Sequence, residues 1–172
     1  PLGRLVLTAE PLPEQLLSFL RSTLALAEVP AAVARSLLSA QEHHPSIAVR
    51  TLSPSFLRGH LKEHAAPHCA TLRGDTSSTA ALASFCVLDL ITLCPHAEHP
   101  GASDFQRRRA YRELGGCPLL SLADGSVQPV PSSPRTPLAW APETVLAALP
   151  RLAPRLPHAG LSLSLSPFIL GQ

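Results

Sequence analysis

Histidines and cysteines with metal-ligand chemistry gather at two places in the chain. In the first cluster, His60, His64 and His68 recur at every fourth position, and Cys69 follows directly. Four-residue spacing places His60 and His64 on one face of a helix, where two imidazoles can share a zinc ion. We expect Pro67 to break that helix before His68. Solvent-facing histidines beside a buried cysteine are therefore the simpler interpretation.

The second cluster consists of Cys94, His96 and His99, in a stretch expected to be a loop. Together the two clusters contain enough ligands for a tetrahedral zinc site, but their separation fits no zinc-finger spacing. We therefore predict no metal-binding residue and no cofactor. A small zinc-binding module or zinc enzyme built from these side chains is the alternative.

No pattern of a catalytic or nucleotide-binding site is present. The chain contains no G-x-S-x-G nucleophile turn, no phosphate-binding G-x-x-x-x-G-K and no G-x-G-x-x-G. We predict no catalytic and no cofactor-binding residue, and so no enzyme. Asp89 lies within a mostly apolar segment, where a carboxylate must be exposed, paired or hydrogen-bonded. We expect a structural pairing, for example with an arginine, rather than a catalytic role.

Composition excludes several broad classes of protein. The 172 residues are 45% hydrophobic and 15% charged, which excludes a wholly disordered chain. A net charge of +2 with one Trp and one Tyr gives no basis for nucleic-acid binding. Asp89 interrupts the most apolar stretch, so no membrane span is expected. Without Met, the chain is expected to be a processed product, an excised piece or an incomplete gene product. We expect a cytoplasmic location with reduced thiols.

The spacing of apolar residues predicts several helices and a few strands. Apolar periodicity, proline positions and turn residues place these elements. The predicted helices cover 13–28, 30–43, 54–65, 78–93, 105–114 and 142–152. We expect an extended segment over 47–51, an irregular stretch over 66–79, and a hairpin from residue 117 to residue 130 around Asp124-Gly125. Its strand would be built by Leu119, Leu120 and Leu122, and the helical core by Phe56, Leu57, Leu61, Phe85 and Leu88.

These elements predict a mixed α+β fold, in which several helices pack with a β-hairpin and a few short strands. We expect residues 1–137 to form the main domain. Residues 138–172 would continue it as a loosely attached or truncated part.

Four segments, in order, resemble patterns of the sacsin-like family, which is related to Hsp90. LGGCPLLSLADGSV (114–127) resembles the family's L-x-G-L-P-L-L-P-L-x-D-G-x-x, and TLSPSFLRGHL (51–61) resembles L-T-P-x-x-V-R-x-x-L. FCVLDL (85–90) is similar to Y-C-L-x-D, and VPAAV (29–33) is similar to V-x-x-P. Cys117 and Ser121 stand where the family has Leu and Pro, and both are compatible with a hairpin. The resemblance covers about two thirds of the chain.

This resemblance implies a repeat region of a very large chaperone, outside its ATP-binding module. That module needs a magnesium-holding Asn and a D-x-G-x-G loop, and this chain contains neither. We therefore expect a non-catalytic segment of a molecular chaperone or scaffold that binds protein partners or clients and neighbouring domains of a longer chain. A simple adaptor that binds partners through a helical groove is a further alternative.

Overall fold

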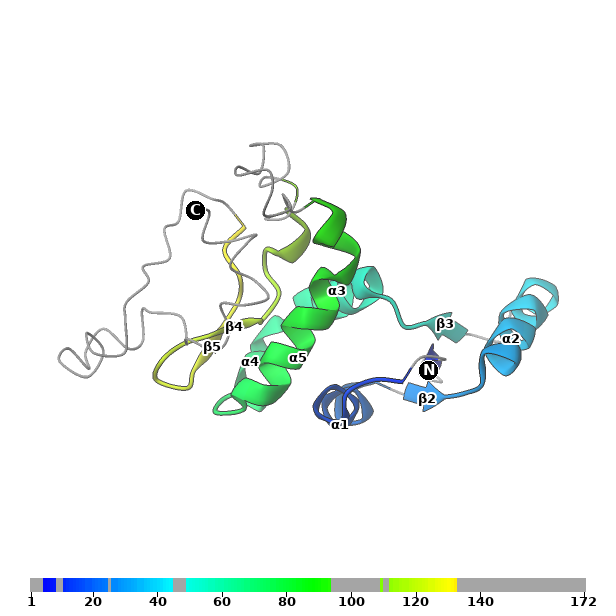
Figure 1. Ribbon diagram of the computed structural model, residues 1–172, viewed down its shortest axis with the longest axis horizontal. Helices are drawn as coiled ribbons and strands as arrows, with labels where there is room; N and C mark the ends of the chain where they lie inside the picture. Colours follow the sequence, from blue (N-terminus) through cyan, green and yellow to red (C-terminus); the bar gives the residue numbers. More distant parts are fainter. Residues whose placement is uncertain are drawn as a thin grey trace. The chain divides into compact units, whose positions relative to one another are not determined.

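The chain folds into two compact units, residues 1–53 and residues 54–172. The computed structural model describes residues 5–8, 11–24, 26–44, 49–93, 109 and 112–132. Helices combine with a small parallel sheet and an antiparallel hairpin (Figure 1), so the predicted mixed α+β class is confirmed. The predicted boundary between 1–137 and 138–172 lies outside the described residues and stays a prediction.

The first unit is a β-α-β-α-β arrangement whose central strand comes first in the chain. Both neighbouring strands run parallel to it, in the order β2-β1-β3. The elements are β1 (Leu5–Thr8), α1 (Glu14–Thr23), β2 (Leu26–Glu28), α2 (Ala31–His43) and β3 (Val49–Thr51). Parallel strands need crossover connections, and the two helices supply them.

The two helices lie on opposite sides of this sheet (Figure 1). The first crossover runs from β1 to β2, and the second runs back from β2 past β1 to β3. Right-handed crossovers in opposite directions along a sheet place their helices on opposite faces. Leu7 of β1 forms a buried cluster with Ala34 of α2 and Val49 of β3. Val6 and Thr8 alternate with Leu7 along β1 and are also buried, so β1 is covered on both faces.

The predicted helix over 13–28 is too long. α1 ends at Thr23, because Leu24 adopts extended dihedral angles (φ −129°, ψ 151°), and β2 follows from Leu26. Pairing with β1 therefore overrides the helical spacing of the apolar residues. The second predicted helix is confirmed: α2 starts directly after Pro30 and ends at His43. The extended segment before residue 52 is confirmed as β3, whereas β1 has no counterpart among the predicted elements.

The second unit packs helices against a hairpin. Its described elements are α3 (Pro54–Glu63), α4 (Ala65–Thr71), α5 (Thr76–Val87), the 3₁₀ helix η1 (Leu88–Leu93), β4 (Leu120–Ser121) and β5 (Val127–Gln128). α3 packs against α5, α4 lies along β5, and α5 lies along β4 (Figure 1). The predicted core residues Leu57 and Leu61 are fully buried, as are Leu119 and Leu122.

Three expectations for this unit need correction. Residues 66–79 are not irregular, since α4 and the start of α5 occupy them. Pro67 is tolerated because it lies in the first turn of α4, where a backbone N–H has no helical partner. Asp75 then caps α5 by accepting a hydrogen bond from the Ser78 N–H at 2.9 Å. Leu88 is 53% exposed and does not belong to the core.

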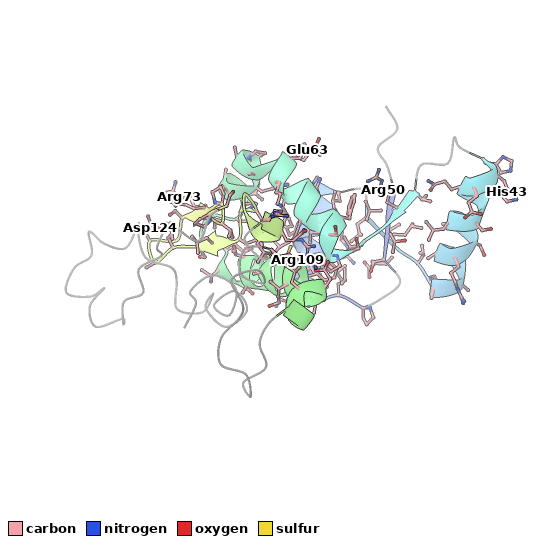
Figure 2. The ribbon with its side chains drawn as sticks, turned by 90° about the horizontal axis from the view of Figure 1, so that it is seen from above. His43, Arg50, Glu63, Arg73, Arg109 and Asp124 are labelled. Carbon is pink, nitrogen blue, oxygen red and sulfur yellow. The ribbon has the colours of Figure 1, made fainter. Side chains whose placement is uncertain are left out.

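The predicted hairpin is confirmed. β4 and β5 pair antiparallel, and Gly125 at the turn has a φ of +78°, which favours glycine. Asp124 holds the turn by accepting hydrogen bonds from the Ser126 N–H and hydroxyl. The Gly74 N–H donates to the Gly125 carbonyl at 2.8 Å. Arg73 and Asp124 accordingly lie at the same end of the unit (Figure 2).

Candidate functional site

A buried arginine, Arg58, lies at the centre of a group of charged side chains in the second unit, and its own side chain is 4% exposed. Its Nη1 donates to Asp89 Oδ1 at 2.5 Å and its Nη2 donates to Asp89 Oδ2 at 2.9 Å. This two-bond geometry matches the planar guanidinium to the carboxylate. The predicted structural pairing of Asp89 with an arginine is confirmed.

Further contacts fix Arg58 to the elements around it. Nη1 also donates to the Cys86 carbonyl at 2.6 Å, and Nη2 lies 3.5 Å from Glu113 Oε2. The Cys117 thiol in turn donates to the Arg58 carbonyl at 3.6 Å. Arg58 therefore joins α3, the end of α5, η1 and the segment that leads into the hairpin. We call this set of five residues the Arg58 junction.

The positive charge of Arg58 is compensated by two carboxylates that are more exposed to solvent than Arg58 itself. Burial disfavours the charged guanidinium, but the hydrogen bonds and charge of Asp89 outweigh it and raise the pKa of Arg58. Asp89 and Glu113 remain partly exposed, with 41% and 39% of their side-chain surface accessible. The two carboxylates therefore keep part of their hydration while neutralising a charge that is cut off from water.

The two cysteines at the junction are poor nucleophiles. Burial raises the pKa of Cys86 well above its ordinary value and raises that of Cys117 to about 11. Both sulfurs thus stay protonated at neutral pH, whereas thiol chemistry requires the thiolate. Sequence reasoning missed Arg58, Glu113 and Cys117 as a group. An arginine between Leu57 and Leu61 on an apolar helix face was the available signal.

The predicted histidine cluster is brought together by the structure. The ring centroids of His60, His64 and His68 are separated by 4.9 Å (60 to 64), 5.1 Å (60 to 68) and 6.0 Å (64 to 68). Burial lowers the pKa of His60, and burial together with His60 and His64 lowers the pKa of His68 to about 4. His68 thus joins the other two, contrary to the expected break at Pro67.

The remaining predictions concern the second cysteine–histidine cluster, metal binding and membrane spans. Cys94, His96 and His99 lie outside the described residues. Within the described ranges, no group of three or more His, Cys, Asp or Glu side chains could hold a metal ion. Among the same residues, no helix is both long enough and apolar enough to cross a membrane.

Comparison of the chain with protein-family models, with curated proteins and with solved structures gave no match. Its own geometry therefore carries the functional argument. In the described part of the chain, that geometry consists of a charge junction tied into the fold and a histidine cluster.

The Arg58 junction predicts that single and double substitutions do not change the free energy of unfolding additively. Asp89→Leu leaves the buried Arg58 charge poorly compensated and should lower the free energy of unfolding by about 3 kcal/mol. Replacing both members, as Arg58→Met with Asp89→Leu, should cost clearly less than the sum of the single changes. Urea unfolding followed by circular dichroism measures all four proteins.

An exposed ion pair serves as the control. Arg21 bonds Glu28 with about half of each side chain accessible, so Arg21→Ala should change stability far less than a substitution at Arg58 or Asp89 does. Additive effects of the Arg58 and Asp89 substitutions would contradict a coupled junction.

The histidine cluster predicts acid sensitivity. The pKa of His68 is about 4 in the folded chain, against about 6.5 for an unfolded histidine. Between these values the unfolded chain binds more protons, so stability falls as pH drops from about 6.5 to about 4, by at most about 3 kcal/mol. Urea midpoints across this range should fall less steeply for His68→Gln than for the natural chain. Carboxylates titrate in both proteins, so equal slopes would exclude His68 as the source.

Proposed function

We propose that this chain is a non-catalytic, protein-binding segment of a sacsin-like, Hsp90-related chaperone or scaffold. The observation that supports this most is the composition of the Arg58 junction. Arg58 stands at the arginine of the family's L-T-P-x-x-V-R-x-x-L pattern, and Asp89 stands at the aspartate of Y-C-L-x-D. These two residues form the two-bond ion pair.

The third patterned segment contacts the main chain of Arg58. Cys117, within the segment that resembles L-x-G-L-P-L-L-P-L-x-D-G, donates its thiol hydrogen to the Arg58 carbonyl. Three segments that carry the resemblance are therefore joined in one packed unit, as expected if the patterns describe one fold. Residues 29–33, which carry the fourth, open α2 in the first unit.

A binding role fits the chemistry of the described side chains better than an enzymatic one. The buried thiols stay protonated, and the Arg58 charge is tied to structural partners. Leu88, in contrast, presents a large apolar side chain to solvent at the start of η1. We assign protein partners or clients, without nucleic acid or membrane. We place the chain in the cytoplasm, where the free Cys69, Cys86 and Cys117 stay reduced.

The family half of the proposal is tested by sequencing the transcript that encodes the chain and translating it beyond both ends. We expect an upstream module in the same reading frame that contains the Asn and the D-x-G-x-G loop of an Hsp90-type ATP site. A start codon directly before Pro1 together with a stop codon directly after Gln172 would overturn the sacsin-like assignment.

The chaperone half is tested by light scattering from a heat-aggregating enzyme, with and without the purified chain. We expect the chain to delay and lower the scattering, because exposed apolar side chains bind unfolded segments. Leu88→Asp should weaken this effect without changing the melting temperature. Ala70→Asp introduces the same charge at an exposed position of α4 and should leave the effect unchanged.

Two outcomes separate the alternatives. Unchanged scattering at every ratio of chain to enzyme contradicts a chaperone and leaves the adaptor interpretation. Equal effects of Leu88→Asp and Ala70→Asp contradict a role for the surface around Leu88.

A further inference from the structure

The short helix α4 is attached to the second unit mainly through one buried side chain, the imidazole of His68. His68 is 6% exposed, and it is the only buried one among the seven residues of α4, all of which the structure describes. α5, in contrast, has six buried residues and a side-chain cap from Asp75, whereas His64 gives α4 no such cap. Elements with few buried contacts open at a lower free energy than the fold as a whole. We therefore expect α4 to open before α5.

Two further imidazoles lie next to this buried ring. The ring centroid of His68 is 5.1 Å from that of His60 and 6.0 Å from that of His64. The His64 N–H donates to the His60 carbonyl at 3.1 Å, and the His68 N–H donates to the His64 carbonyl at 3.2 Å. The four-residue register therefore continues from α3 into α4 and keeps the rings together. A proton on any one ring adds a positive charge close to the other two.

The charges on the elements that pack against α4 give these rings little compensation. On α3, Glu63 acts on His60, but the Lys62 amine donates to the Arg112 carbonyl at 3.1 Å (Figure 2). The strand β5, which packs against α4, contains no ionisable residue. Among the described neighbours of the cluster, Glu63 is thus the carboxylate that favours a protonated ring.

The charges beyond α4 are paired with each other. In the turn after α4, Arg73 acts on Asp124 at the tip of the hairpin. Burial together with His60 and His64 lowers the pKa of His68 to about 4, and burial lowers the pKa of His60. The closed arrangement of α4 therefore disfavours a proton on the ring that anchors it.

We propose that His60, His64 and His68 form an acid-sensitive latch, in which the neutral rings keep α4 in place and protonation releases α4 while α5 stays folded. In the open form, water surrounds the rings, and His68 binds a proton with an ordinary histidine pKa of about 6.5. Opening therefore takes up a proton and becomes more favourable as pH falls below that value. Opening also loosens the hairpin tip, because the Gly74 N–H just after α4 donates to the Gly125 carbonyl. This inference goes beyond the proposed function and does not depend on it.

Amide hydrogen exchange of the full natural chain between pH 7 and pH 5 tests the proposal. With rates corrected for intrinsic exchange, protection of residues 68–72 should fall by about twentyfold or more, as uptake of one proton requires. At each pH, low urea concentrations should affect this protection much less than that of α5, because local opening exposes less surface than global unfolding. Equal protection and equal urea dependence of the two helices would overturn the latch, since α4 would then open only when the whole unit unfolds. Protection of residues 68–72 that does not change with pH would overturn it as well.

Matched variants identify the ring that takes up the proton. His68→Gln keeps a polar side chain but cannot gain a charge, so the loss of protection between pH 7 and pH 5 should become several-fold smaller. His43→Gln, at the exposed end of α2, should lose protection of residues 68–72 as the natural chain does. Equal pH dependence in His68→Gln and His43→Gln would exclude His68 as the trigger. The measurements on the natural chain decide between local and global opening even where His68→Gln does not fold.

Discussion

The second unit depends on neutralising one positive charge that is almost entirely removed from water. A buried guanidinium destabilises a fold unless acceptors surround it in good geometry. Asp89 supplies two of these acceptors and the Cys86 carbonyl supplies a third. Because α3 carries the charge while the end of α5 and η1 carry the acceptors, these elements must be placed together before the charge is satisfied. The hydrogen bonds of Arg58 therefore tie α3 to the end of α5 and to η1.

Contacts within the second unit hold the hairpin at both its base and its tip. At its base, the Gly116 N–H donates to the Val130 carbonyl, and Cys117 touches Arg58. At its tip, the Gly125 carbonyl accepts from Gly74 in the turn after α4. Two short strands would not be stable alone in water. Attachment at base and tip explains how so small a hairpin keeps one register.

Local patterns predicted the elements whose signals lie within a few neighbouring residues. Asp124-Gly125 indicated the hairpin, and the helix predicted to start at residue 54 does begin at Pro54. The parallel sheet was not predictable in this way, because β1 is only four residues long and its partners are distant in sequence. Asp89 was correctly expected to be paired, since an apolar helix demands it. Its partner Arg58 lies 31 residues away and emerged only from the packing. The alignment of His68 with His60 was missed because Pro67 can also occupy the first turn of a new helix.

The order of strands in the first unit has a consequence for how the chain is made. β1 leaves the ribosome before its neighbours but occupies the centre of the sheet. Pairing of Leu5 with Val49 must wait until α1, β2 and α2 have emerged. Until then the edge of β1 that pairs with β3 stays unpaired, and such edges promote association between chains. Because the chain is made from its N-terminus, there is an interval during which β1 can associate with other chains. The duration of this interval is set by the speed of translation through the first two helices.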